Sequence, residues 1–195
     1  MNNDLISRKY ELTEEKKEVL GRTLYRIRAL KDFEVSNGTI IHAGDLGGWI
    51  EKEDNLSQEG SAWVSGEARV YGEAWVSGEA RVSGEAWVYG NAWVFGEAEV
   101  YGNAEVYGNA EVSGKAWVSR ITHVMTFGPA GSRHGCTTFY RNKNNGISVT
   151  CGCFNGSIDD FLAQVEITHG DNKHGQVYRT AAELAKLQID LEDVE

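Results

Sequence analysis

The stretch Gly60-Ser-Ala-Trp-Val-Ser65, Gly66-Glu-Ala-Arg-Val-Tyr71 opens a series of ten six-residue repeats that runs to Ser119 without an insertion. Glycine recurs at every sixth position, and alanine and valine recur two and four positions after it. Because alanine and valine stand two positions apart, both point to the same face of a short strand, and glycine then lets the backbone turn. A single hexad buries too little to be stable, so successive coils must stack. The period therefore predicts a parallel β-solenoid.

This pattern resembles the hexapeptide repeat of left-handed β-helix proteins, in which three hexads make one triangular coil. The phase extends upstream, with Ile50 and Leu56 on the alanine register, so the resemblance covers residues 48–119 and implies twelve hexads in four coils. We therefore expect a mainly β fold in three parts. These are an N-terminal β cap over 1–47, the left-handed β-helix over 48–119, and a small C-terminal α+β ligand-binding unit over 120–195.

Three hexads per coil place residues eighteen apart directly above one another, so the outward side chains form columns. Large aromatic side chains exposed in columns are typical of an interface, and proteins with this repeat often form trimers. We expect a homo-oligomer, with a trimer as the first expectation. The alternative is that the rings stack along the sheet only to stabilise it. The residues expected at the interface are Trp63, Trp75, Trp87, Trp93, Trp117, Tyr71, Tyr89 and Tyr107.

The net charge of −10 is concentrated in the repeat, because residues 48–119 hold 12 acidic and 4 basic side chains. Such a surface repels phosphate backbones, which disfavours general nucleic-acid binding. No apolar run approaches the length of about 20 residues that a membrane span needs. The first nine residues lack an apolar leader and the cysteine count of three is odd, so we expect a protein of the reducing cytoplasm.

The repeat lacks the residues that its enzymatic relatives use. Acyltransferases with this repeat resemble each other in using a histidine, and γ-class carbonic anhydrases hold zinc with several histidines. Residues 60–119 contain no histidine. His42 stands alone upstream of the coils. We therefore expect the β-helix to be a scaffold without acyltransferase or carbonic anhydrase activity, and we expect no cofactor.

Residues 120–195 break the repeat and carry the signals of a mixed unit. Two β-rich segments, 136–141 and 147–153, predict a hairpin around Asn142–Gly146. Ser157, followed three residues later by Asp160, resembles a capping box that starts a helix ending before Gly170. Thr180 and Glu183 suggest a second capping box, which predicts another helix over 181–187.

Polar and glycine-rich segments of this unit predict a binding site for a small anionic or nucleotide-like ligand. The glycine-rich loop over 128–135 offers backbone N–H groups and one guanidinium, and the run 168–174 follows a helix. The alternatives are an ordinary tight turn and a helix C-cap. The residues expected to bind ligand are Ser132, Arg133, His134, Thr137, Thr138, His169, Asp171, Asn172 and Lys173.

The same unit leaves two chemical alternatives open. If Arg141 pairs with Gly146, the hairpin gathers four potential zinc ligands, although Cys-x-Cys is an unusual spacing for such a site. Buried, reduced thiols are the more common outcome, so we expect no metal. The zinc ligands would be His134, Cys136, Cys151 and Cys153, and an enzyme would use His134, Cys151, His169 or Asp171 as acid, base or nucleophile.

Several runs outside the repeat carry a second resemblance. Leu24–Asp32, Ala43–Glu51, Cys151-Gly-Cys-Phe154 and Thr168-His-Gly-Asp-Asn-Lys173, together with the hexads, resemble uncharacterised phage and prophage hexapeptide-repeat proteins. The resemblance implies a viral protein in the cytoplasm of a bacterial host. By analogy it suggests counter-defence through sequestration of a small nucleotide signal. The alternatives are an inhibitor or scaffold that grips a host protein with its Trp and Tyr columns, and a nucleotide-processing enzyme.

Overall fold

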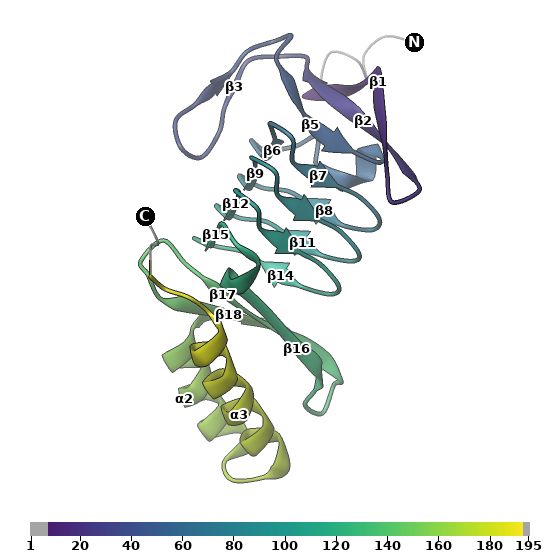
Figure 1. Ribbon diagram of the computed structural model, residues 1–195. Coiled ribbons are helices and arrows are strands. Elements are labelled where there is room, and N and C mark those ends of the chain that lie inside the picture. Colours follow the sequence, from purple (N-terminus) through teal and green to yellow (C-terminus); the bar gives the residue numbers. More distant parts are fainter. Residues whose placement is uncertain (1–7, 193–195) are drawn as a thin grey trace.

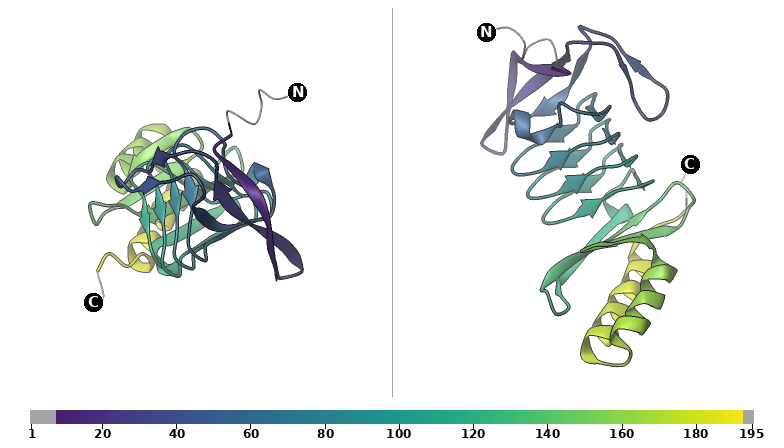
Figure 2. Two further views of the ribbon diagram at one scale, coloured as in Figure 1. Left: turned by 90° about the horizontal axis from the view of Figure 1, so that it is seen from above. Right: turned by 180° about the vertical axis from the view of Figure 1, so that it is seen from behind.

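The computed structural model describes residues 8–192 and is mainly β. The fold is a parallel β-helix with a β cap at one end and an α+β unit at the other, stacked along one axis (Figures 1 and 2).

Each repeat contributes a two-residue strand to one of three faces. The first face holds β5 (Leu46–Ile50), β7 (Arg69–Val70), β10 (Trp87–Val88) and β13 (Glu105–Val106). The second holds β8 (Trp75–Val76), β11 (Trp93–Val94) and β14 (Glu111–Val112), and the third holds β6 (Trp63–Val64), β9 (Arg81–Val82), β12 (Glu99–Val100) and β15 (Trp117–Val118).

The expected stacking of residues eighteen apart is confirmed. Trp75 pairs with Trp93 and Trp93 with Glu111, and the other two faces follow the same interval. Every repeat valine from Val64 to Val118 is fully buried, and the repeat alanines line the same core. Burying each valine contributes about 1.5–3 kcal/mol of transfer free energy, so the ten repeat valines together are a main source of the stability of the β-helix.

The first coil departs from the expected register. Ile50 pairs with Val70 and Leu56 bridges Val76, so both lie on the valine register and the prediction of an alanine register is wrong. The interval is 20 positions in each of these pairs, against 18 elsewhere, because the segment between Leu56 and Trp63 is longer than its counterparts. Ile50 and Leu56 still add one strand or bridge each to the first and second faces. Each of the three faces therefore has four levels, which make four coils.

The N-terminal cap covers the open edge of that first coil. β1 (Tyr10–Val19) pairs with β2 (Arg22–Ala29), β2 pairs with β5, and the short strands β3 (Phe33–Glu34) and β4 (Ile40–Ile41) form a separate ribbon. The buried Lys9 ammonium donates to the Ala62 carbonyl at 2.8 Å, and the Tyr10 hydroxyl donates to the Leu56 carbonyl at 2.7 Å. Edge carbonyls that would otherwise be unpaired are thereby satisfied. Burial of Lys9, assisted by the charge of Lys31, lowers the Lys9 pKa to about 8.

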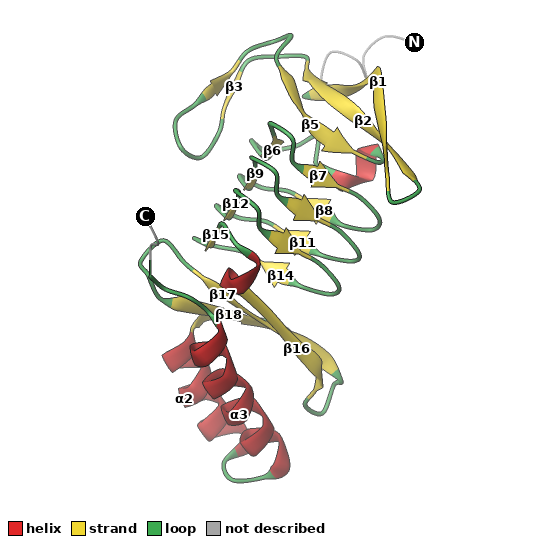
Figure 3. Ribbon diagram, viewed as in Figure 1, coloured by secondary structure: helices red, strands yellow, loops and turns green. Residues whose placement is uncertain are grey.

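The C-terminal unit closes the other end. β16 (Val124–Ala130), β17 (Gly135–Arg141), β18 (Ile147–Cys151) and β19 (Phe154–Ser157) form an antiparallel sheet in chain order. The helices α2 (Ile158–His169) and α3 (Lys173–Gln188) cover one face, and the last coil lies against the other (Figure 3). Between the C-terminal sheet and the last coil, the Thr138 hydroxyl accepts a hydrogen bond from the Glu111 backbone N–H at 3.0 Å.

The helix boundaries confirm one prediction and correct another. Ser157 caps α2 by accepting from the Asp160 N–H, and Gly170 ends the helix as expected. The second helix begins at Lys173 and not at 181, because the Asn172 side chain caps it. Thr180 therefore lies inside α3, where its hydroxyl donates to the Gln176 carbonyl. Within residues 8–192 no helix combines the length and apolar character that crossing a membrane would require.

Candidate functional site

Two adjoining cavities open at the edge of the C-terminal sheet, and we call them together the C-terminal hollow. The larger has a volume of about 290 Å³ and the smaller about 120 Å³. They share four lining residues, Cys151, Thr168, His169 and Tyr178, so they lie side by side. The larger cavity is also lined by Ala130, Ser132, Arg133, Gly135, Cys136, Gly152 and Cys153, and the smaller by Phe154, Phe161, Gln164 and Val165.

The turn between β16 and β17 forms the polar mouth of the hollow. Ser132 and Arg133 are exposed on it. Gly131 has φ +68°, and a Cβ there would lie 2.1 Å from the Tyr178 hydroxyl. Only glycine therefore lets the turn approach α3 this closely. Within residues 8–192 the Arg133 guanidinium makes no ion pair, so it is available to a ligand anion.

The Cys151 thiol lies where the two cavities meet. The Thr137 hydroxyl donates to its sulfur at 3.1 Å, and the Tyr178 hydroxyl also hydrogen-bonds it. Burial, followed by the proximity of Cys151, raises the pKa of Tyr178 above its usual range. The arrangement holds a thiol between two hydroxyl groups at the end of β18.

The end of α2 supplies the opposite wall. His169 is the last residue of this helix, and its ring lies 5.6 Å from the Tyr178 ring and 5.8 Å from the His174 ring, centroid to centroid. No hydrogen bond joins His169 to Cys151 in the part of the chain that the structure describes. The pair shares a cavity without the contact that a nucleophile and its base need.

Of the residues predicted to bind ligand, Ser132, Arg133 and His169 line the hollow. Thr137 and Thr138 do not reach it, because both are buried and hydrogen-bonded within the fold. Their prediction as ligand contacts is wrong for a simple reason. Neighbouring residues of a strand point to opposite faces, and both faces of β17 are covered.

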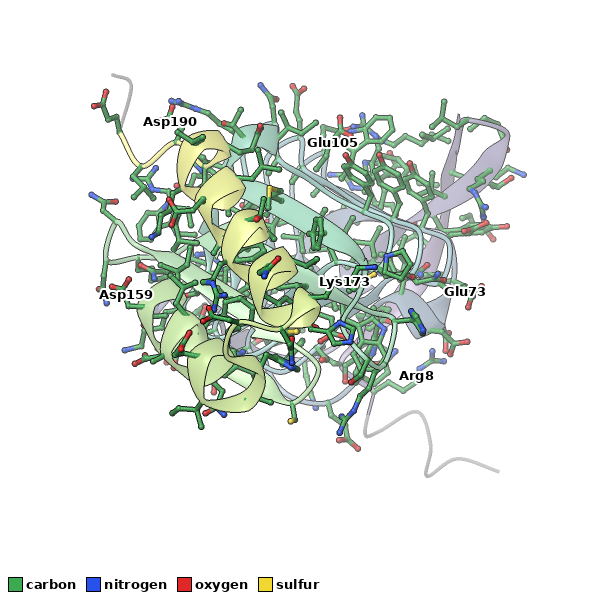
Figure 4. The ribbon with its side chains drawn as sticks, turned by 90° about the horizontal axis from the view of Figure 1, so that it is seen from below. Arg8, Glu73, Glu105, Asp159, Lys173 and Asp190 are labelled. Carbon is green, nitrogen blue, oxygen red and sulfur yellow. The ribbon has the colours of Figure 1, made fainter. Side chains whose placement is uncertain are left out.

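The other four predicted ligand residues also lie outside the hollow. His134 is exposed at a left-handed turn position, and Asp171 forms an exposed ion pair with Arg179 at 3.1 Å. Asn172 is the N-cap of α3. Lys173, at the start of α3, lines a different cavity beside Val177 and Leu184 (Figure 4). The run 168–174 is therefore chiefly a helix–turn–helix connection.

Sequence reasoning missed the apolar part of the site. No local pattern marked Phe154, Phe161 or Val165 as lining a cavity, and Tyr178 lay outside the predicted helix over 181–187. Correct placement of the Asn172 cap would have put Tyr178 on α3, where its ring packs against Phe161 of α2. The Asn-x-x-Gly spacing at 172–175 was the available signal, since asparagine is a preferred N-cap.

The structure does not assemble the zinc alternative. Thr137, not Cys136, lies opposite Cys151, because Arg141 pairs with Ile147 and the hairpin register differs by one from the expected one. A shift of one residue moves a side chain to the other face, so the Cys136 sulfur faces Asn109 of the coils and the Cys151 sulfur faces Thr137, although both residues border the larger cavity. Among residues 8–192 no group of three or more His, Cys, Asp or Glu side chains is placed to hold a metal ion.

The predicted interface residues differ in exposure. Trp63 and Tyr71 are 3% and 5% exposed, so they are covered within the chain, and the prediction that they face a partner is wrong. The Trp63 ring packs against Phe33 and Tyr10 of the cap. Trp87 and Tyr89 are partly covered, whereas Trp75, Trp93, Tyr107 and Trp117 are exposed.

Comparison with known proteins adds no relative. No protein-family model and no curated protein matches the chain.

Proposed function

We propose that the chain is a non-enzymatic binding protein that holds a small, ring-bearing anion, such as a nucleotide, in the C-terminal hollow. The observation that carries the proposal is the division of this hollow into two chemically different parts. Its inner part is lined by Phe154, Phe161 and Val165, and its mouth carries Ser132 and Arg133. Ligand sites commonly combine an apolar wall with a few polar groups that set orientation.

The two parts suit the two halves of such a ligand. A planar ring entering the inner cavity would contact aromatic side chains and lose little hydrogen bonding to water. An anionic group left at the mouth would meet the planar guanidinium of Arg133, which binds phosphate or carboxylate through two parallel hydrogen bonds. The Ser132 hydroxyl and the Thr168 side chain supply further polar contacts at the rim.

Binding is favoured over catalysis by the surroundings of Cys151 and His169. Both line the hollow, which keeps a nucleotide-processing enzyme as the rival function. The thiol, however, takes its hydrogen bonds from hydroxyl groups, and the imidazole packs against aromatic rings. In the cell, such binding would sequester a nucleotide signal of the host, which is the role that the phage resemblance suggests.

A thermal-shift panel of cyclic and linear nucleotides tests the proposal. A bound nucleotide at a hundredfold excess over its dissociation constant should raise the unfolding free energy by about 2.7 kcal/mol. Arg133→Ala should remove most of that gain, because the anion loses its charged partner. Lys115→Ala, which removes an exposed cation far from the hollow, should leave the gain intact.

A second pair of variants tests the position of the ligand. Thr168→Trp should block the rim of the hollow, whereas Ile167→Trp places the same bulk on the exposed neighbouring position of α2. Nucleotide recovered unchanged after incubation supports binding without turnover. A panel with no stabilising nucleotide, or the appearance of a product that Cys151→Ser abolishes, would overturn the proposal.

A further inference from the structure

Cations from the non-repeat segments cover aromatic rings on the faces of the β-helix. The Lys17 ammonium lies 4.1 Å from the centroid of the Trp49 ring, and the Arg26 guanidinium lies 5.0 Å from it. Both cations also pair with the Glu67 carboxylate, at 2.8 and 3.4 Å. Each cation is thus held by an aromatic ring and a carboxylate together.

The same arrangement occurs at two other places. Arg22 lies 5.8 Å from the Tyr71 ring and pairs with Glu51 at 2.8 Å. At the far end, Lys143 of the β17–β18 turn lies 5.7 Å from the Trp117 ring and pairs with Glu99 at 2.7 Å. In all three, the coils supply ring and carboxylate, and a segment outside the repeat supplies the cation.

One part of the prism carries rings and carboxylates without cations. Trp75 and Trp93 are 39% and 46% exposed on the second face, and Glu111 continues their column. Around the corner, Tyr107 ends a stack of tyrosine rings beside Glu105. Within residues 8–192 no Lys or Arg pairs with either carboxylate or lies over any of these three rings. These five residues span two neighbouring faces of the prism and the corner that joins β13 to β14, and we call them together the aromatic–acidic face.

A small hollow of about 100 Å³ adjoins this face, lined by Glu105, Tyr107, Ile121, Val124 and Thr126. Its volume suits the head of one side chain and is too small for a nucleotide. Viewed from below, Glu105 lies on the opposite side of α3 from α2, clear of the C-terminal helices (Figure 4). The Tyr89 hydroxyl donates to one oxygen of Glu105 at 3.1 Å, which fixes the carboxylate in place.

We propose that the aromatic–acidic face binds a basic, arginine- or lysine-bearing segment of a partner protein, which supplies cations that residues 8–192 do not place there. Charge complementarity favours this partner, because residues 48–119 hold 12 acidic and 4 basic side chains. Two copies meeting through the same face would instead bring their own carboxylates together. The surface shares no residue with the C-terminal hollow, so the inference stands apart from the proposed function.

Titration of the full chain with a fluorescein-labelled hexa-arginine peptide, followed by anisotropy, tests the inference. Trp93→Ala leaves the charge unchanged and removes the ring, so it should weaken binding about fivefold, and Trp93→Phe should restore much of the loss. Glu105→Gln and Glu111→Gln should each weaken binding several-fold. Glu14→Gln makes the same charge change at an exposed position of β1, in the N-terminal cap, and should have little effect.

The variants separate this surface from its alternatives. If Trp93→Ala and Glu105→Gln weaken binding no more than Glu14→Gln, the attraction is general and the inference is wrong. If light scattering shows an oligomer that Trp93→Ala dissociates, a second copy covers the face, and the inference is also wrong. Arg133→Ala should keep full peptide affinity, which distinguishes failure here from failure of the nucleotide site.

Discussion

Single atoms at the corners of the coils decide how closely the coils can stack. Gly90 and Gly108 occupy the same corner of successive coils, with φ of +73° and +67°. A Cβ on Gly90 would lie 3.0 Å from the Gly108 nitrogen, whereas a Cβ on Gly108 would meet nothing within 4 Å. The two glycines therefore have the same left-handed backbone. They differ because the next coil packs against Gly90, whereas no atom lies where a Cβ on Gly108 would point.

This pair gives a prediction at the residue scale. Gly108→Ala should lower the free energy of unfolding by about 1–2 kcal/mol, the cost of a left-handed backbone for a residue with a Cβ. Gly90→Ala should lower it by about 1–3 kcal/mol more, because it adds a contact with backbone that cannot move aside easily. Urea unfolding of both variants measures the difference. Equal losses would show that backbone conformation alone selects glycine at these corners.

At the scale of elements, β17 joins the two halves of the molecule. Thr138 and Tyr140 face the β-helix, where the Tyr140 ring belongs to the coil core. Thr137 and Phe139 face the helices, and the Phe139 ring packs against Phe161. One strand thus closes the last coil with one face and supports the C-terminal hollow with the other.

The two faces predict unequal effects of one substitution. Thr138→Val leaves the Glu111 backbone N–H without its acceptor and should cost about 1–3 kcal/mol of unfolding free energy. Thr137→Val removes a hydroxyl that donates to a sulfur, a weak acceptor, and should cost less. Both threonines are equally buried, so chemical unfolding compares the lost hydrogen bonds directly. A larger loss of unfolding free energy for Thr137→Val would contradict this prediction and would show that the contact with Cys151 is the more stabilising one.

At the scale of the whole molecule, the chain has two large cores with no buried residue in common. One runs from Tyr10 in the cap through the coils to Tyr140, and the other lies between the C-terminal sheet and its helices. All six tryptophans lie in residues 48–119, whereas the α-helices found among residues 8–192 lie in residues 158–188. Tryptophan fluorescence and helical circular dichroism therefore report on different cores.

This separation predicts that the helical layer can be destabilised alone. Ala182 is fully buried against the C-terminal sheet, and Ala182→Asp would place an unpaired charge there. The circular dichroism transition should move to a lower urea concentration, while the fluorescence transition moves little. Glu183→Asp, at the exposed neighbouring position of α3, serves as control. Transitions that shift together would mean that the two cores unfold as one cooperative unit.

The candidate site followed from the sequence only in part. Arg133 and Ser132 were recognisable because a glycine-rich turn with one cation is a local signal. Phe161 and Val165 carried no such signal, since apolar residues at helical spacing are equally expected in a core, and the cap signal at Asn172 predicts a helix through Tyr178 without marking Tyr178 as a site residue. Their role depends on how α2 and α3 cross the sheet.

The sequence by itself determined the β-helix, its inward valines and the columns of outward residues. A strict period allows only one register of stacking, because a slip would expose every valine at once. Tertiary structure alone decided which outward rings remain free. Trp63 and Trp93 occupy equivalent repeat positions, yet the cap buries the first and leaves the second exposed. The same holds for Thr137, whose hydroxyl meets Cys151 and not a ligand. Contacts between segments distant in sequence depend on the packing of the whole chain, which no local pattern records.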